Sequence, residues 1–273
     1  MLGFVVDRDR CLRDGLCQLA CGRGVIHDDG QGGPEIPDDK ASLCNACGHC
    51  SAVCPVHAIT SPGSGGEEAV PIDSALTVEF AAAREFILSC RSIRKFREPE
   101  VAENEILELL DIARKAPSAS NSQSLRWLVI NGREKMRQFT KLTMEWFDTV
   151  VRNDPAMNGR YAVDSMMERY NAGHDPILRG APNAVLALSD KGFAWGPVDA
   201  SIALTYFCLS AHGRNIGSCW CGFGMRAAEA YAPVREFLKL DQNTTVHAMA
   251  FFGYPDIRYH ALPPRKPLRV AWL

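Results

Sequence analysis

The chain of 273 residues lacks several features that would place it in a particular class of protein. It contains no apolar run of about 18 residues, so we expect no transmembrane helix. Its net charge is only −2, which gives no reason to expect a nucleic acid or a membrane surface as a partner. The N-terminus, MLGFVVDRDRC, lacks the basic start and long apolar stretch of a signal peptide, so we expect a cytoplasmic protein.

Several familiar catalytic motifs are missing as well. No G-x-G-x-x-G follows an expected strand, so no Rossmann nicotinamide-binding module is predicted. Neither a Ser-His-Asp arrangement nor an H-E-x-x-H motif is visible, and the seven histidines are scattered along the chain. We therefore expect most histidines to be surface or packing residues.

Cysteine, by contrast, is abundant and unevenly distributed. Seven of the eleven cysteines lie within the first 54 residues. A secreted disulfide framework usually has an even number of cysteines in a short chain. The odd number and the crowding favour metal ligands in a reducing compartment.

These cysteines form an internal repeat. Residues 44–55 read CNACGHCSAVCP, and residues 11–21 read CLRDGLCQLAC. An offset of 33 residues places each cysteine of the first stretch on one of the second and leaves Asp14 opposite Cys47. The run C-x2-C-x2-C-x3-C-P is typical of iron–sulfur proteins, in which the fourth cysteine ligates the other cluster. Zinc sites usually pair C-x2-C with a distant second pair, so the spacing favours iron–sulfur over zinc.

The same rule assigns two sets of ligands. One cluster takes Cys21, Cys44, Cys47 and Cys50, and the other takes Cys11, Cys17 and Cys54 with Asp14 at its fourth corner. A carboxylate is a harder ligand than a thiolate and holds iron less tightly. Three alternatives stay open for Asp14: a corner of a four-iron cluster, a neighbour of a three-iron cluster, or a loop residue only. Residues 1–60 resemble a bacterial two-cluster ferredoxin, and some ferredoxins resemble this chain in having Asp at that place.

The rest of the chain divides in two by composition. Residues 61–72 are rich in Gly, Ser and Pro, which predicts a linker, and residues 25–36 before them predict a hairpin. From residue 73 to 273 helical and strand patterns alternate, which predicts an α+β or α/β domain. The predicted helices are 74–90 (with Ser74 as N-cap), 100–116, 198–215 and 234–240, and the predicted strands are 125–132, 183–190 and 245–255. Residues 134–180 are expected to be helical or irregular, and residues 263–273 extended.

Two polar stretches of this second part are suited to a flavin. The stretch CRSIRKF (90–96) places Arg91, Ser92 and Arg94 together. An FMN phosphate needs arginine forks and hydroxyls, and an arginine at an alternate position can reach the pyrimidine edge. The loop APSASNSQS (116–124) offers hydrogen-bond donors to a flavin rim.

Two further stretches complete this set. IGSCWCGFG (216–224) is predicted to be a Gly-rich turn, where the backbone can approach a ring closely. PPRKP (263–267) adds Arg265 and Lys266. Each stretch alone is a weak signal, since basic pairs are usually solvated and Gly-rich turns are usually only turns.

Together and in order, these stretches resemble the nitroreductase family of FMN enzymes over residues 75–273. The family pattern RRSIRxF matches at 91–96, its P-S-x-x-N-x-Q loop at 117–123 and its GSCWxG turn at 217–222. The resemblance implies an α+β, nitroreductase-like FMN fold (73–273) with a small N-terminal ferredoxin-like domain that carries two [4Fe-4S] clusters. It also implies a homodimer with FMN at the subunit interface.

The resemblance assigns the FMN contacts by position. One subunit would supply Arg91, Ser92, Arg94, Arg265 and Lys266, and the other Pro117, Ser118 and Asn121, while Cys219, Trp220, Cys221 and Gly222 would lie along the isoalloxazine. Cys90 departs from the family pattern, because it replaces the first arginine of a pair and so removes or replaces a phosphate contact. Cys221 stands where some members have Glu, which leaves NAD(P)H use and substrate range open. For both Cys219 and Cys221 a packing role is expected over a redox role.

The sequence therefore predicts an oxidoreductase of the nitroreductase type. Electrons would enter at the clusters, pass to FMN and leave to a small organic acceptor such as a nitroaromatic, a quinone or an activated alkene. NAD(P)H and reduced ferredoxin are both open as donors, and no catalytic residue is assigned. The alternative is an electron carrier or redox sensor without a small-molecule substrate of its own.

Overall fold

The computed structural model describes residues 3–63 and 69–273. The chain forms two compact units, namely Met1–Val78 with Ser118–Gln123, and Glu79–Pro117 with Ser124–Leu273. The predicted linker falls partly on residues outside this description, and the domain boundaries predicted at residues 60 and 73 stay predictions. The segment 118–123 belongs to the first unit by its contacts, although the second unit surrounds it in the sequence.

The first unit is built from short elements around a small apolar core. They are β1 (Val5–Val6), α1 (Leu16–Ala20), β2 (His27–Asp28), β3 (Pro34–Glu35), η1 (Asp38–Leu43), α2 (His49–Ala52), β4 (Ile59–Thr60), η2 (Ser74–Leu76) and η3 (Ala119–Asn121). Strand β1 pairs with β4 and β2 with β3, both antiparallel, which confirms the predicted hairpin. The core consists of Cys17, Val25, Ile26 and Ile59.

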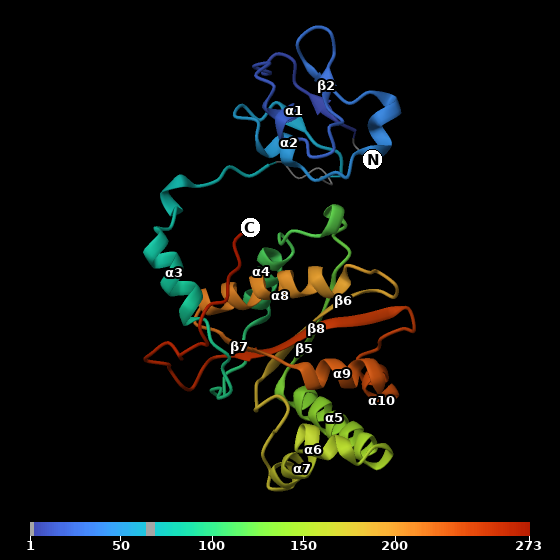
Figure 1. Cartoon of the computed structure of the whole chain (residues 1–273), viewed down its shortest axis with the longest axis vertical. Helices are drawn as coiled ribbons and strands as arrows, with labels where there is room; N and C mark the ends of the chain where they lie inside the picture. Colours follow the sequence, from blue (N-terminus) through green and yellow to red (C-terminus); the bar gives the residue numbers. More distant parts are fainter. Residues whose placement is uncertain (1–2, 64–68) are drawn as a thin grey trace. The chain divides into compact units, whose positions relative to one another are not determined.

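The second unit is a four-stranded sheet with helices on both faces (Figure 1). Its strands are β5 (Arg126–Asn131), β6 (Asn183–Asp190), β7 (Gly217–Trp220) and β8 (Thr244–Gly253), in the antiparallel order β5-β6-β8-β7. Its helices are α3 (Phe80–Ser89), α4 (Glu103–Ala113), α5 (Arg133–Asn153), α6 (Ala156–Tyr161), α7 (Val163–Asn171), α8 (Gly196–Gly213), α9 (Gly222–Ala230) and α10 (Ala232–Phe237).

The central strands β6 and β8 are mostly apolar because both faces of the sheet are covered. Along a strand successive side chains point to opposite faces. In β6, Leu186 therefore joins the core formed with α5 and α9, while Val185 joins the core formed with α4 and α8. Figure 1 shows these two groups of helices on opposite sides of the sheet. A continuous apolar run is what such a doubly covered strand requires.

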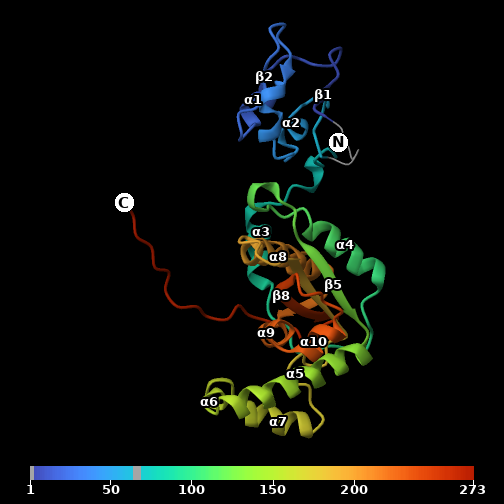
Figure 2. The same ribbon diagram turned by 90° about the vertical axis from the view of Figure 1, so that its right-hand side faces the viewer.

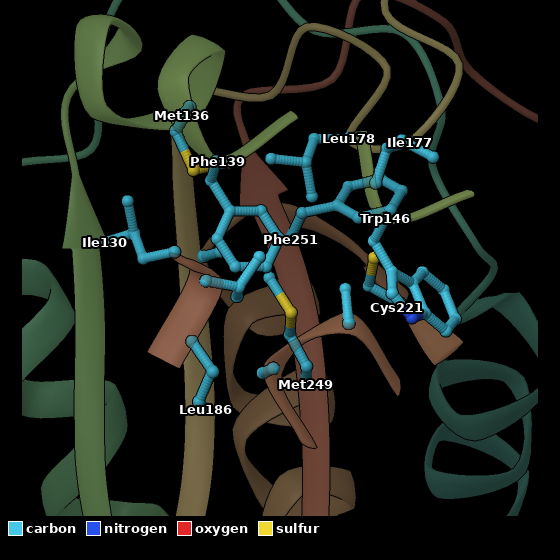
Figure 3. Packing of buried hydrophobic residues seen from close by; sticks show 14 of the residues in the cluster. Ile130, Met136, Phe139, Trp146, Ile177, Leu178, Leu186, Cys221, Met249 and Phe251 are labelled. Carbon is cyan, nitrogen blue, oxygen red and sulfur yellow. The ribbon is translucent and has the colours of Figure 1, made fainter. Parts of the chain in front are cut away.

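The larger core lies between the sheet and α5. In Figure 3, Met136 and Phe139 of α5 meet Leu186 of β6 and Met249 and Phe251 of β8. Phe139 is completely buried. Each large apolar side chain buried in this way stabilises the fold by about 1.5–3 kcal/mol. The core fixes the position of the sheet, whose edge strand β7 carries candidate flavin-site residues considered below.

Most predicted helices and strands of the second unit are confirmed, with one clear error among the helices. The predicted helix 74–90 is wrong as a single element, because extended backbone at Thr77 separates η2 from α3. The capping prediction is also wrong: the side chain of Asp73, not Ser74, accepts a hydrogen bond from the amide of Ala75 at 2.9 Å. The β-branched pair Thr77-Val78 favours extended backbone over helix. Within the described residues no helix is long and apolar enough to cross a membrane.

Candidate functional site

The 33-residue repeat seen in the cysteines is also present in the backbone of the first unit. Four pairs of residues 33 positions apart share a left-handed conformation, with φ between 50° and 79°. They are Arg13 and Ala46, Gly15 and Gly48, Gly24 and His57, and Gly30 and Gly63. Non-glycine residues adopt this conformation at a cost of roughly 1–2 kcal/mol. The shared turns therefore give the two cysteine arms the same local geometry.

The first set of predicted ligands surrounds a small hollow of about 70 Å³. Cys11, Asp14, Cys17 and Cys54 all line it. Burial raises the pKa of the Cys17 thiol, and the nearby negative charges of Cys11 and Asp14 raise it further, against backbone N–H groups that lower it. The structure thus brings together the four side chains that the sequence assigned to one cluster.

Asp14 has a second, structural contact. Its Oδ1 atom accepts a hydrogen bond from the amide of Leu16 at 3.1 Å, at the start of α1. A side chain in this place satisfies one of the free N–H groups of the first helical turn. One carboxylate oxygen of Asp14 is therefore used in a hydrogen bond to the first turn of α1.

The structure also brings together the second set of predicted ligands, which are Cys21, Cys44, Cys47 and Cys50. Burial raises the pKa of Cys50 to about 11, and the charges of Cys47 and Cys44 contribute to the increase. Around Cys21, burial raises the thiol pKa, but backbone N–H groups from residues 23–26 outweigh that effect and lower it. Hydrogen bonds of this kind stabilise an anionic sulfur and tune cluster potentials.

The donor chemistry fits two iron–sulfur clusters. All eleven cysteines are free thiols. Cys21, Cys44 and Cys50 pack against the apolar core that contains Val25 and Ile26. Soft thiolates in an apolar surrounding are what such clusters bind. Within the described part of the chain, no three His, Cys, Asp or Glu side chains converge as they would around a single ion. A cluster is wider than one ion, so its ligands stand further apart.

The segment 118–123 contacts the cluster arm directly. The Nδ2 group of Asn121 donates to the backbone carbonyls of Asn45 at 3.1 Å and Ala46 at 3.0 Å, between the predicted ligands Cys44 and Cys47. Ser120, Asn121 and Gln123 all have positive φ, which costs free energy for residues with side chains. Sequence reasoning assigned Asn121 to FMN and missed this contact, because nothing in the sequence joins two segments 75 residues apart. The FMN roles of Pro117, Ser118 and Asn121 stay predictions.

In the second unit the segment with Arg91 and Ser92 runs along β7. The amide of Ile93 donates to the carbonyl of Ser218 at 3.0 Å, and Ser92 and Ser218 form a parallel bridge. A Cβ atom on Gly217 would lie 2.6 Å from Ile93 Cγ1. Only glycine at this position lets the two segments approach so closely.

A hollow of about 850 Å³ lies beside this segment. Its lining includes Ser89, Arg91 and Ser218 together with Arg258 and His260. Cations and hydroxyls around an open space of this size fit a phosphate with an attached ring system. The residues present therefore fit FMN.

The predicted basic pair of the C-terminal segment is placed elsewhere. Arg265 and Lys266 lie on exposed, extended chain, which Figure 2 shows leaving the rest of the unit, and they do not line the hollow. Arg258 and His260 occupy it instead and were missed, although the basic stretch DIRYH was a signal of the same kind. An FMN role for Arg265 and Lys266 stays a prediction.

The predicted Gly-rich turn is wrong for residues 217–220, which form strand β7. Cys219 pairs with Phe251 of β8, and this pairing supplies the backbone hydrogen bonds that a turn would lack. The strand alternates, so Cys219 is buried while Trp220 is 47% exposed. Gly222 is also exposed, and a Cβ there would meet no atom within 4 Å.

The non-cluster cysteines behave as packing residues. Burial raises the pKa of Cys208 to about 11 and that of Cys221 to about 12. Burial also raises the pKa of Cys90, with Arg91 opposing. Thiols with raised pKa values are mostly protonated near neutral pH and are poor nucleophiles. This agrees with the packing role expected for Cys221.

Comparison with known proteins identifies both parts of the chain. A family model described as "Nitroreductase family" matches residues 87–254, and one described as "4Fe-4S binding domain" matches residues 40–60. The chain belongs to the nitroreductase family. It is a nitroreductase-type flavin oxidoreductase fused to an N-terminal ferredoxin-like region.

Individual nitroreductase relatives are distant. A 4-nitrobenzoate reductase from Nocardioides sp. is 24% identical over 62% of this chain and 78% of its own length. An iodotyrosine deiodinase from Thermotoga neapolitana is 23% identical over 61% of this chain and 84% of its own length. A nitroreductase with bound FMN from Desulfitobacterium hafniense superposes with a TM-score of 0.57 at 19% identity, covering 70% of this chain and 97% of that one. That similarity shows the fold.

Proposed function

We propose that the protein passes electrons from a donor through two iron–sulfur clusters to FMN and on to a small organic acceptor. The observation that carries the proposal is the joint presence of two gathered ligand sets and a nitroreductase-family unit in one chain. Clusters carry electrons singly, whereas reduction of an organic molecule takes two. FMN, when bound, supplies the exchange between single electrons and pairs.

The residues of the chain hold and position these groups. Arg91 would bind the FMN phosphate, with Ser89, Ser218 and Arg258 at the same hollow, whereas Ser92 does not line that hollow and its FMN role stays a prediction. Trp220, which is 47% exposed, and the exposed backbone at Gly222 would lie beside the ring system. The cysteine sets would hold the clusters, and hydrogen bonds to Cys21 would tune the potential of its cluster.

The active form in this proposal is a homodimer. The C-terminal segment carries Leu268, Val270 and Trp272, which are 89%, 56% and 92% exposed. Large apolar side chains exposed along one segment are typical of a surface that another chain covers. A second subunit that receives this segment would bury them and bring Arg265 and Lys266 to a flavin site.

The acceptor in this proposal is a nitroaromatic or a related electron-poor molecule. A relative named 4-nitrobenzoate reductase supports this class. NAD(P)H and reduced ferredoxin are the two candidate donors: the first would reduce the flavin directly, and the second would deliver single electrons to the clusters.

Metal analysis and rapid mixing test the proposal together. Anaerobically purified protein should hold about eight irons per chain, or about seven if the Asp14 site has three. Mixing oxidised protein with each donor in an anaerobic stopped-flow instrument should reduce the clusters and the flavin. Four or fewer irons would contradict the two-cluster assignment, and a flavin that no donor reduces would contradict the electron path.

A further inference from the structure

A second hollow of about 530 Å³ lies on the other side of the segment that carries Arg91. Arg91 and Ile93 line the first hollow, whereas Arg94 and Lys95 line the second, and the two share no residue. The second hollow is bordered by α5, by the end of α7 and by the loop 173–181. Arg94, which is predicted to bind the flavin, lines this second hollow. The hollow is therefore a candidate binding site for a molecule that exchanges electrons with the flavin.

Positive charge dominates this second hollow. Six of its lining side chains are cationic, namely Arg94, Lys95, Arg133, Arg137, Arg169 and Arg179. Asp175 is the one carboxylate in the lining, and its oxygens are already used. They accept hydrogen bonds from the amides of Ile177, Leu178 and Gly180 at 2.8–3.1 Å and from the hydroxyl of Thr140 at 3.2 Å. Asp175 therefore shapes the loop rather than pairing with an arginine.

Two of the arginines have structural partners. Arg133 donates to the carbonyls of Arg97, Glu98 and Gly180 and so ties α5 to two loops. Arg137 pairs with Glu134 one turn away on α5. The guanidinium group of Arg133 is thus occupied within the fold, and that of Arg137 is engaged in an exposed ion pair on α5.

The remaining arginines have no such partners. Over the described residues, the guanidinium groups of Arg94, Arg169 and Arg179 form no hydrogen bond or ion pair. Arg179 is half-buried and has a φ of 59°, a strained conformation that the Asp175 loop imposes. Burial lowers its pKa, and the positive charges of Arg169 and Arg94 lower it further against the opposing effect of Asp175. Three like charges held together without a counter-ion cost free energy that a bound anion would offset.

We propose that Arg169 and Arg179 bind the carboxylate of the electron acceptor, which would be a small planar carboxylic acid. This proposal rests on the proposed function and names its substrate class. The planar guanidinium fork matches a carboxylate with two parallel hydrogen bonds. Arg179 also lies near the thiols of Cys219 and Cys221, beside the segment expected along the flavin. An acid held here by its carboxylate would extend its unsaturated part toward that segment.

The FMN phosphate is the other anion that could fill such a site. Arg91, Ser89 and Ser218 already offer it a cation and hydroxyls at the first hollow. The second hollow contains no serine or threonine in its lining, but it concentrates arginines. The distribution of donors therefore favours phosphate at the first hollow and carboxylate at the second.

Binding of benzoate and of neutral benzamide to the oxidised holoprotein tests the proposal by titration calorimetry, without turnover. The wild type should bind benzoate at least tenfold more tightly than benzamide. Arg169→Ala and Arg179→Ala should each weaken benzoate binding about tenfold, which corresponds to the loss of about 1.4 kcal/mol, and leave benzamide binding and FMN content unchanged. Arg137→Ala, at the same hollow but paired with Glu134, is the matched control and should bind benzoate like the wild type.

Three results would overturn the proposal. They are equal binding of benzoate and benzamide by the wild type, benzoate binding that neither variant weakens, and FMN loss in both variants with benzoate binding intact. The last result would identify the anion as the FMN phosphate. Circular dichroism confirms folding of each variant, and the surface-exposed Arg169 keeps the test valid if Arg179→Ala fails to fold. Because no electron is transferred in this experiment, its failure is distinct from a failure of the electron path.

Discussion

Asp14 shows how one side chain can combine two tasks. Its Oδ1 atom accepts a hydrogen bond from Leu16 at the start of α1, and its carboxylate lines the hollow with three cysteines. Asn at position 14 can still accept the hydrogen bond from the amide of Leu16, but it lacks the negative charge of the carboxylate. We therefore expect Asp14→Asn to fold normally but to give a three-iron EPR signal if the wild-type carboxylate binds iron.

Two companion variants make the outcome decisive. Asp14→Cys should yield four-iron signals and hold its cluster more firmly under oxidation, because thiolate is the softer ligand. Asp14→Ala should leave three iron atoms on Cys11, Cys17 and Cys54. Identical EPR spectra of all four proteins would mean that Asp14 only accepts the hydrogen bond from Leu16 at the start of α1.

Gly217 is the residue on which the position of the segment with Arg91 and Ser92 depends most directly. A methyl group there would lie 2.6 Å from Ile93, so the segment with Arg91 must shift away from β7. We expect Gly217→Ala to lower the free energy of unfolding by about 1–3 kcal/mol, as overpacking does, and to weaken FMN retention. Urea denaturation and flavin fluorescence after gel filtration measure the two effects. Gly159→Ala on α6, where a methyl group meets nothing, is the control and should lose neither.

We expect His247 to make the free energy of unfolding depend on pH. Its Nε2 atom lies 2.7 Å from the hydroxyl of Ser189, and burial lowers its pKa, with Glu229 opposing. The unfolded chain therefore binds a proton more readily than the folded one. This contribution to stability is complete above the ordinary histidine pKa of about 6.5 and is lost as the pH falls through the lower folded value.

The corresponding experiment compares two proteins at two pH values. Between pH 7.5 and pH 5.5 the wild type should lose more stability to urea than His247→Gln, which cannot titrate. The pKa of His212 is also lowered by burial, so a smaller loss should persist in the variant. Equal losses in both proteins would show that His247 does not contribute.

Among the elements, the segment 118–123 is the one whose role the sequence least predicted. Asn121 uses both amide hydrogens on the carbonyls of Asn45 and Ala46, each bond worth about 0.5–1.5 kcal/mol. We expect Asn121→Ala to loosen the arm between Cys44 and Cys47 and to speed iron loss to a chelator, followed by cluster absorbance. Gln123→Ala changes an exposed neighbour in the same segment and should lose iron like the wild type. Equal rates in all three proteins would contradict a role for the contact.

Local sequence patterns predicted those elements whose cause is local. The strand Asn183–Asp190 was predicted with its correct limits, because its continuous apolar run at 184–188 is typical of a strand covered on both faces. The left-handed turns near Gly15 and Gly48 follow the cysteine repeat, so the two ligand sets could be predicted from spacing. The helix at 74–90 was predicted too long, because apolar spacing outweighed the β-branched Thr77 and the capping Asp73.

Convergence of distant residues could not be predicted in the same way. Arg94, Arg169 and Arg179 lie at three separate places in the sequence, and each alone is a common surface residue. Residues 217–220 were predicted as a turn because Gly217 and Gly222 suggested one. The structure shows instead that Gly217 is required by a close approach to Ile93, which depends on tertiary packing.

At the scale of the whole molecule, the proposal assigns electron entry to the first unit. A variant that lacks residues 1–78 should hold no iron but should keep FMN, because the family model matches residues 87–254 alone. With reduced ferredoxin as donor, it should lose the fast phase of flavin reduction in stopped-flow absorbance. Dithionite, which reduces flavin directly, should still bleach it. An unchanged fast phase would mean that electrons reach FMN without the clusters.

The order of strands in the sheet also has a consequence for synthesis of the chain. Strand β6 can pair with β5 early, but the centre of the sheet waits for β8, the last strand, which ends at Gly253. The last segment of the cluster-binding unit ends at Gln123, about 130 residues earlier. At about 5–20 residues per second, this leaves roughly 7–26 s on the ribosome between the two events. Cluster loading therefore has time to precede completion of the flavin domain, and strand β6, which ends at Asp190, is exposed to aggregation for about half of that interval.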